Sequence, residues 1–235
     1  MDLKEISNFI TSSAKSLNIK KWDFGASFSN DFSVQVDKGI AKQLKASQKQ
    51  VLTLRVWNKK NLVGITTTSD LSENGLKKAL YQANLASDYG NKNELTDFSP
   101  LAKDPIKDIK QAKRSPAGIK KLLETLRFAE SELLKKHSAI KTIPYNGLSE
   151  SFYKRIYANS EGAQRSYAKS QAAIYLYARA EENNRKPRSS GSVKIGYGLE
   201  DIDINSCIDE AAEKTISHLN YSAIETGKYK VCFSP

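Results

Sequence analysis

The feature that most constrains this fold is a long alternation of side chains over residues 164–180. Even positions carry small or apolar side chains, and odd positions carry mainly basic and aromatic ones. A period of two predicts a β-strand with one face against a core. At about 3.3 Å per residue, this strand exceeds roughly 45 Å, which is longer than an ordinary strand. It must therefore curve, bulge or extend past its own domain.

The rest of the chain alternates between helical and strand-like periodicity. Helices are predicted over 2–17, 73–88, 116–136 and 206–219, and strands over 22–28, 32–36, 40–47, 50–57, 62–68, 139–145, 150–159, 164–180 and 193–199. Asp2 and Ser72 are predicted N-caps, and Ser206 with Asp209 resembles a capping pair.

These elements predict an α+β fold with two domains, each an antiparallel β-sheet flanked by helices. The expected division is 1–99 for the first domain, 100–115 for a linker and 116–225 for the second domain. Residues 226–235 are expected to begin a truncated C-terminal domain, because KYKVCFSP has the pattern of a buried strand. We therefore expect the natural protein to continue beyond Pro235.

The net charge of +11 raises the question of nucleic-acid binding, but its distribution argues against it. Residues 101–144, a linker and one helix, contribute +6 of this charge, and the chain has 29 Lys against 8 Arg. A general lysine bias explains this better than a phosphate-binding face. No apolar run approaches the roughly 20 residues that a membrane helix needs. The start, MDLKEISNFI, lacks the basic and then apolar pattern that is typical of a secretion signal. The expected location is the cytoplasm.

Few residues could carry out catalysis. His137 and His218 have no ligand-like neighbours, and Cys207 and Cys232 form no CxxC pair. There is no P-loop, GxGxxG or GxSxG motif. The sequence therefore predicts no catalytic residue, no metal ligand and no cofactor-binding residue.

The odd-numbered face of the long strand is the one candidate functional surface. Its members are Arg165, Tyr167, Lys169, Tyr175, Tyr177 and Arg179. They could simply be the solvated face of a half-buried sheet. They could also form a platform for an extended peptide or a partner subunit, because tyrosine supplies contact area and basic groups bind carbonyls or carboxylates. Single-stranded nucleic acid would use the same residue types.

Four segments, in this order, resemble the TldD/PmbA family, long labelled modulators of DNA gyrase. They are VQVDKGIAKQLKASQKQVLTLRVW (34–57), GITTTSDLSENGLKKALYQANLAS (64–87), YANSEGAQRSYAKS (157–170) and TGKYKVCFSP (226–235). The TSDLS form of the second segment favours the PmbA/TldE branch.

This resemblance implies the N-terminal part of a PmbA/TldE-like subunit of a TldD/TldE-type metalloprotease that processes or degrades extended peptides. By the same resemblance, zinc belongs to a TldD-like partner, in an HExxxH helix of its C-terminal domain. The chain would then shape the substrate chamber and the interface with a TldD-like subunit or a second copy of itself, without a metal site of its own. A nucleic-acid-binding or gyrase-associated module remains the alternative.

Overall fold

The computed structural model describes residues 2–90, 98–105 and 114–233. Its helices are α1 (Leu3–Ser16), α2 (Glu73–Ser87), α3 (Gly118–Lys135) and α4 (Ile204–Ser217), with short 3-10 turns η1 (Pro100–Lys103) and η2 (Leu199–Asp201). Its strands are β1 (Lys21–Asp37), β2 (Ile40–Trp57), β3 (Val63–Thr68), β4 (Ile140–Asn159), β5 (Gln164–Ala180) and β6 (Arg188–Gly196). None of the helices in these described ranges is long and apolar enough to cross a membrane.

The six strands form one antiparallel sheet in the order β3-β2-β1-β4-β5-β6. The α+β class is confirmed. The strands are longer than the sequence pattern suggests: the pieces predicted at 40–47 and 50–57 are one strand, β2, and those at 139–145 and 150–159 are one strand, β4. The sheet thus continues across the expected boundary at 100–115, while the division into domains remains a prediction.

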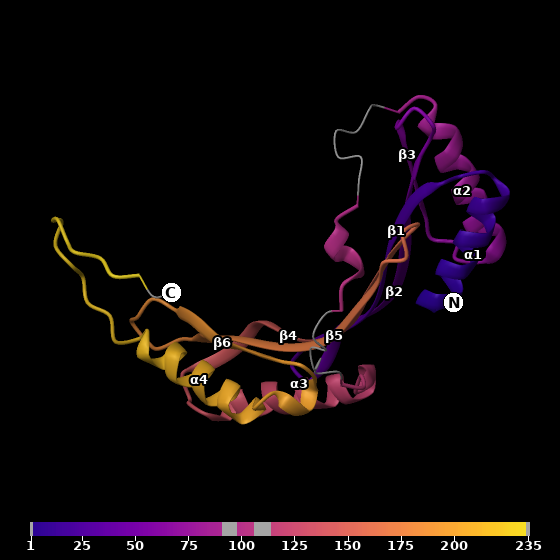
Figure 1. The fold of residues 1–235 in the computed structure, drawn as a ribbon. Helices are drawn as coiled ribbons and strands as arrows, with labels where there is room; N and C mark the ends of the chain where they lie inside the picture. Colours follow the sequence, from indigo (N-terminus) through magenta and orange to yellow (C-terminus); the bar gives the residue numbers. More distant parts are fainter. Residues whose placement is uncertain (1, 91–97, 106–113, 234–235) are drawn as a thin grey trace.

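Two helix pairs cover opposite ends of the same sheet face. The strand β1 shows this directly, because its even-numbered side chains enter both hydrophobic clusters. Trp22 and Phe24 pack in the cluster beneath α1 and α2, and Val34 and Val36 pack in the cluster beneath α3 and α4. Figure 1 shows that the sheet bends between the two pairs, with all four helices on its outer side. The opposite, inner side carries no α-helix in the described part of the chain.

Three buried polar side chains fasten remote segments to this framework. Glu130 accepts hydrogen bonds from the backbone N–H groups of Lys38 (3.0 Å) and Gly39 (2.7 Å) in the β1–β2 turn. Asn146 pairs with both backbone groups of Val36, at 3.0 and 2.9 Å. Each side chain provides hydrogen bonds for backbone groups that would destabilise the fold if they were left unpaired.

The third of these side chains is Glu150, on the helix-covered face of β4. It accepts hydrogen bonds from the backbone N–H of Ala117 at 2.8 Å and of Leu199 at 3.3 Å. The side chain is buried. One carboxylate therefore fixes both the start of α3 and the turn η2 at the centre of the sheet.

The helix starts agree partly with the sequence predictions. Asp2 forms a full capping box with Glu5, and the side chain of Ser72 accepts a hydrogen bond from Gly75 N. The predicted cap of the last helix is wrong, because Asp203, and not Ser206 with Asp209, accepts the hydrogen bond from the backbone N–H of Ser206. The third helix begins at Gly118, two residues after the predicted Pro116.

The predicted buried strand near the end of the chain is wrong for this structure. Residues 226–233 form no strand, and their apolar side chains are exposed, with Phe233 at 86%. The alternation of Tyr229, Val231 and Phe233 is strand-like, but the described part of the chain offers these residues no neighbouring strand. A period of two describes which side chains would share a face, and pairing partners decide whether a strand forms.

Candidate functional site

The candidate site is the sheet face opposite the helices, here called the open face. It consists of the odd-numbered residues of β1, β3, β5 and β6, of β2 from Gln43, and of β4 from Tyr145. Antiparallel pairing sets these residues in rows across the strands, so that side chains distant in sequence become neighbours. Figure 1 shows residues 98–105 running along this side of the sheet.

All six predicted surface residues lie on the open face. The even-numbered side chains of β5 are buried from Ala168 onward, and Ala172, Ile174 and Leu176 pack beneath α3 and α4. The odd-numbered side chains are half-buried or exposed, with Tyr167 exposed by 45% and Tyr177 by 41%. The assignment of these side chains to two opposite faces of β5 is therefore confirmed. Whether this face binds a peptide or a partner stays a prediction.

Two of the six residues have local partners. Arg165 donates a hydrogen bond to the backbone oxygen of Asp104 at 2.6 Å, and Arg179 forms an ion pair with Glu181 at 2.8 Å. These contacts occupy both guanidinium groups at the ends of the strand. The two arginines therefore differ from Tyr167, Lys169, Tyr175 and Tyr177, because their charged groups are already bound to other parts of the chain.

Tyr175 lies flat against the sheet because its neighbour in register is a glycine. Gly147 pairs with Tyr175, and a Cβ added to this glycine would lie 2.5 Å from the tyrosine ring. The Tyr175 hydroxyl accepts a hydrogen bond from Gln35 Nε2 at 2.8 Å, so the ring reaches over β4 towards β1. A side chain at position 147 would displace this ring. Sequence reasoning missed Gly147 and Gln35, since only the strand register brings them to Tyr175.

Sequence reasoning also missed a charged cluster on the open face, near the start of β1. Asp23 is 2% exposed, and Arg55 binds it with two hydrogen bonds, one of them 2.8 Å between Nε and Oδ1. The Tyr157 hydroxyl donates to the same carboxylate at 3.3 Å. The bond to Asp23 raises the pKa of Arg55, and burial followed by the Asp23 charge raises the pKa of Tyr157. This cluster ties β2, β1 and β4 together with its charges satisfied, which fits a structural role.

Residues 98–105 cover part of the open face. The ring of Phe98 meets Trp57 edge-on, with centroids 5.6 Å apart, and Lys103 lies 3.6 Å from Glu161. With the Arg165 contact, these interactions hold the segment against the ends of β2 and β5. The middle of the open face carries none of these contacts.

The described residues hold no group fit for a metal. Among residues 2–90, 98–105 and 114–233, no three His, Cys, Asp or Glu side chains are placed to hold an ion together. His137 and His218 sit at the ends of α3 and α4, where Nδ1 of His137 accepts a hydrogen bond from Ala139 N. Burial raises the pKa of the Cys207 thiol, which keeps it protonated and a poor metal ligand. The family resemblance implies zinc in a TldD-like partner, and the described part of this chain holds no ligand set that fits a zinc ion.

The acidic residues before α4 have local contacts that explain their positions. Arg114 binds Asp201 through two hydrogen bonds of 3.0 and 2.9 Å and contacts Glu200 at 3.2 Å. The hydrogen bond from Arg114 lowers the pKa of Asp201. With Asp203 capping α4, all three carboxylates have local roles.

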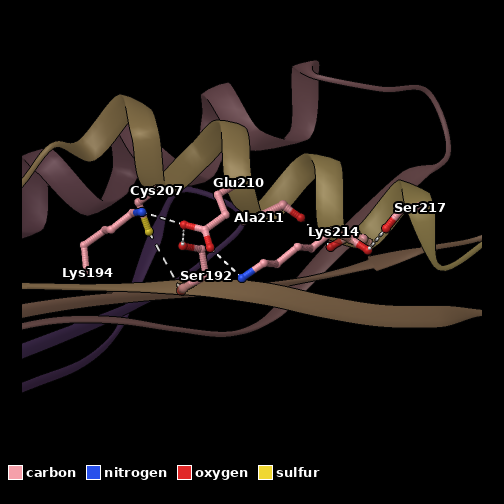
Figure 2. A network of polar contacts seen from close by, with 8 residues as sticks. Ser192, Lys194, Cys207, Glu210, Ala211, Lys214 and Ser217 are labelled. Atoms are coloured by element: carbon pink, nitrogen blue, oxygen red, sulfur yellow. Dashed lines mark hydrogen bonds and ion pairs between the residues drawn. The ribbon is translucent and has the colours of Figure 1, made fainter. Parts of the chain in front are cut away.

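A second titratable cluster joins α4 to β6 on the helix-covered face (Figure 2). Glu210 accepts hydrogen bonds from Lys194 Nζ and Lys214 Nζ at 2.5 Å each, and from Ser192 Oγ at 2.8 Å. These donors, Lys194 foremost, lower the pKa of Glu210 from its usual 4.5 to about 2. The Cys207 thiol donates to the Ser192 carbonyl at 3.8 Å. Each of the polar groups drawn has its partner inside the cluster, so it fastens the edge strand and offers no reactive group.

We expect Glu210→Gln to lower the stability of the chain and to flatten its acid dependence. The folded-state pKa of Glu210 lies below the unfolded one, so its contribution is present above pH 4.5 and is lost as the pH falls towards about 2. Urea unfolding at several pH values between these limits measures the effect. Glu213→Gln, on the same helix but exposed, is the matched control. An acid dependence of Glu210→Gln equal to that of the parent chain would contradict the assignment.

Comparison with known proteins places these features in context. Residues 112–219 match the family model of the PmbA/TldA metallopeptidase central domain. No match is found among curated protein sequences.

Three solved structures share the fold. A Thermotoga maritima protein, described as a candidate modulator of a DNA gyrase, has a TM-score of 0.80 and 17% identity, covering 96% of this chain and 50% of its own. TldE from Thermococcus kodakarensis has a TM-score of 0.70 and 16% identity, over 89% and 47%. A Bacteroides thetaiotaomicron protein, also described as a candidate modulator of DNA gyrase, has a TM-score of 0.76 and 13% identity, over 96% and 52%. The chain therefore spans about half the length of the structures it matches.

Proposed function

We infer that this chain, whose residues 112–219 match the PmbA/TldA metallopeptidase central domain, is a PmbA/TldE-like subunit that holds extended peptides and carries no catalytic metal site. The observation that carries the proposal is the open face. It is a long, curved sheet surface with exposed tyrosine and basic side chains and no α-helix covering it in the described part of the chain. Exposed amphipathic patches of this kind usually mark interaction sites.

The open face suits an extended chain more than a compact ligand. Its strands are 17 to 20 residues long in β1, β2, β4 and β5, so an extended peptide could follow them over many residues. Tyrosine supplies contact area at low conformational cost, and lysine and arginine can bind peptide carbonyls or carboxylates. In the assembled protein, this face would border the substrate chamber or the interface with a TldD-like subunit or a second copy. Both cysteines are free thiols, in keeping with the proposed cytoplasmic location.

Binding of a labelled unfolded peptide to the purified chain, followed by fluorescence anisotropy, tests the proposal. We expect saturable binding that a compact folded protein does not displace. A chain that binds no unfolded peptide of any composition, and that does not associate with a TldD-like subunit, would refute it.

We expect this chain to bind no stoichiometric zinc and to hydrolyse no peptide by itself. The reason is that His137, His218 and Cys207 lie at separate structural positions with other contacts. Metal analysis of the purified chain and a peptide-cleavage assay measure the two properties. Stoichiometric zinc that disappears in His218→Ala or Cys207→Ala would overturn this part of the proposal.

Nucleic-acid binding is the second candidate, favoured by the net charge of +11 and by the basic side chains on the open face. Salt dependence separates the two. Binding through many phosphates weakens by roughly 10³-fold or more between about 50 and 200 mM salt, because counterions are released. An oligonucleotide that binds with this dependence, and more tightly than any peptide, would favour the second candidate.

A further inference from the structure

The open face carries a group of basic side chains that form no ion pair with the described residues. Lys45 and Lys49 lie on β2, Arg155 on β4 and Lys169 on β5, and all four side chains are exposed. Among the described residues, no carboxylate forms an ion pair with any of them. Arg55, Arg165 and Arg179 differ, because each is bound to a carboxylate or a carbonyl of the chain itself.

Strand register brings these basic groups together in the middle of the sheet. Lys49 pairs with Ser29, Ser29 with Tyr153, and Tyr153 with Lys169, which makes one row across four strands. Arg155 lies in the adjacent row and stacks on the Tyr153 ring, 4.9 Å from its centroid. Lys49, Arg155 and Lys169 form what is here called the basic centre. The contacts described above for residues 98–105 are with Trp57, Glu161 and Arg165, and not with these three residues.

The end of the open face beneath β6 is apolar and aromatic instead. Tyr145, Tyr177, Val193 and Ile195 are all exposed there, with Tyr145 at 70% and Ile195 at 65%. Val193 is the register partner of Tyr175, whose ring lies flat over β4. This apolar end adjoins the basic centre along the strand direction, so an extended ligand would contact both.

We propose that the open face selects extended peptides in which acidic residues flank or adjoin an aromatic or apolar segment. The carboxylates would lie over the basic centre, and the apolar side chains over Tyr175 and Val193. This inference rests on the proposed function and specifies its substrate class.

The position of Asp31 favours a peptide over a nucleic acid. Asp31 lies on the open face one row from Lys49 and Lys169, between Ser47 on β2 and Ser151 on β4. A nucleic-acid backbone carries a charge at every unit and could not avoid this carboxylate. A peptide carries charge only where its sequence places it, so a neutral residue can lie over Asp31.

Three labelled peptides of about twelve residues, roughly 40 Å long when extended, test the proposal by fluorescence anisotropy. All share one Tyr-Val segment in a Ser/Gly background, and they differ by carrying several Glu, Gln or Lys residues beside it. We expect the Glu peptide to bind at least about tenfold more tightly than the Gln peptide at low salt, and the Lys peptide to bind weakest. An oligo-dT of similar length serves as the nucleic-acid probe.

Charge-reversed variants locate the effect. Lys49→Glu with Lys169→Glu should remove the preference for the Glu peptide over the Gln peptide, or reverse it. Lys77→Glu with Lys120→Glu, on exposed positions of α2 and α3, changes the net charge equally and should preserve the preference.

Each alternative outcome has a separate meaning. Equal binding of all three peptides, or a preference unaffected by the Lys49 and Lys169 changes, refutes the charge selection and leaves the proposed function standing. Absence of binding by every peptide refutes both. Tighter binding of oligo-dT than of the Glu peptide, lost in the same double variant, assigns the basic centre to nucleic acid and overturns the inference.

Discussion

Replacing Tyr175 and Tyr177 by Ser is expected to leave the fold intact and to weaken peptide binding or subunit assembly by about 2 kcal/mol or more, which is roughly 30-fold in affinity. Neither tyrosine belongs to a hydrophobic core cluster, and both lie on the open face. Tyr175 is the flat ring over Gly147, so its loss removes contact area at the point where the apolar end begins. Circular dichroism and urea unfolding test the fold, and peptide anisotropy with a subunit pull-down tests the function.

Tyr89→Ser is the matched control for this double variant. Tyr89 follows α2, is 94% exposed, and lies outside the open face. If the double variant unfolds, the two tyrosines support the core and their assignment to an interaction surface is incorrect. If it folds, assembles and binds peptide like the parent chain, the open face is an ordinary solvated sheet surface.

The largest expected effect on stability comes from Glu150→Ala, which should lower the free energy of unfolding by about 3 kcal/mol. The change removes a buried carboxylate that is the shared acceptor of the partly buried backbone N–H groups of Ala117 and Leu199. The start of α3 and the turn η2 would both loosen from the sheet. Urea unfolding, followed by tryptophan fluorescence and circular dichroism, measures the loss.

Two further variants serve as comparisons for Glu150→Ala. Glu150→Gln keeps one oxygen acceptor, so its loss should be smaller than that of the alanine variant. Glu161→Ala removes an exposed carboxylate from the β4–β5 turn and should change stability by less than about 1 kcal/mol. A Glu150→Ala chain as stable as the Glu161→Ala chain would show that neither N–H depends on this carboxylate.

Local sequence signals predicted the elements of this fold well. The four helices and the strand at 164–180 follow from apolar periodicity, and Asp2 and Ser72 from capping preferences. The faces of β5 were also predictable, because a strand has only two faces and its small side chains occupy one of them. These features depend on neighbours within a few residues.

The register of the β1–β2 hairpin could not be predicted in this way. An unbroken hairpin from the Asp37–Ile40 pair would set Asp23 opposite Leu54. Lys42 instead has no register partner, since Gln35 pairs with Gln43 and Val36 with Ala41. This one-residue bulge places Asp23 opposite Arg55. From Gln43 onward, it also exchanges the side chains of β2 between the two faces of the sheet. The composition of the open face, including Lys45 and Lys49, follows from that single insertion.

The hydrogen bonds of the buried polar side chains could not be predicted for a related reason. Glu130 and Asn146 lie in segments that read as ordinary helix and strand, and their partners Gly39 and Val36 are about a hundred residues away in sequence. Nothing in the local pattern marks a carboxylate or an amide as an acceptor for a remote backbone. The prediction likewise treated Arg165 and Arg179 as equivalent to the tyrosines, because their local partners are set by tertiary contacts.

Because the sheet is uninterrupted, we expect that the segment matched by the family model, residues 112–219, would not fold by itself. Residues 112–219 contain α3, α4 and three strands, yet Val34 and Val36 of β1 complete the cluster that these helices cover. If the segment were produced alone, β4 would lose its partner strand β1, and most of β4 would become an unpaired sheet edge. The hydrophobic cluster would also lack the side chains of Val34 and Val36. The segment that sequence comparison detects and the part of the chain that shares one sheet therefore have different boundaries.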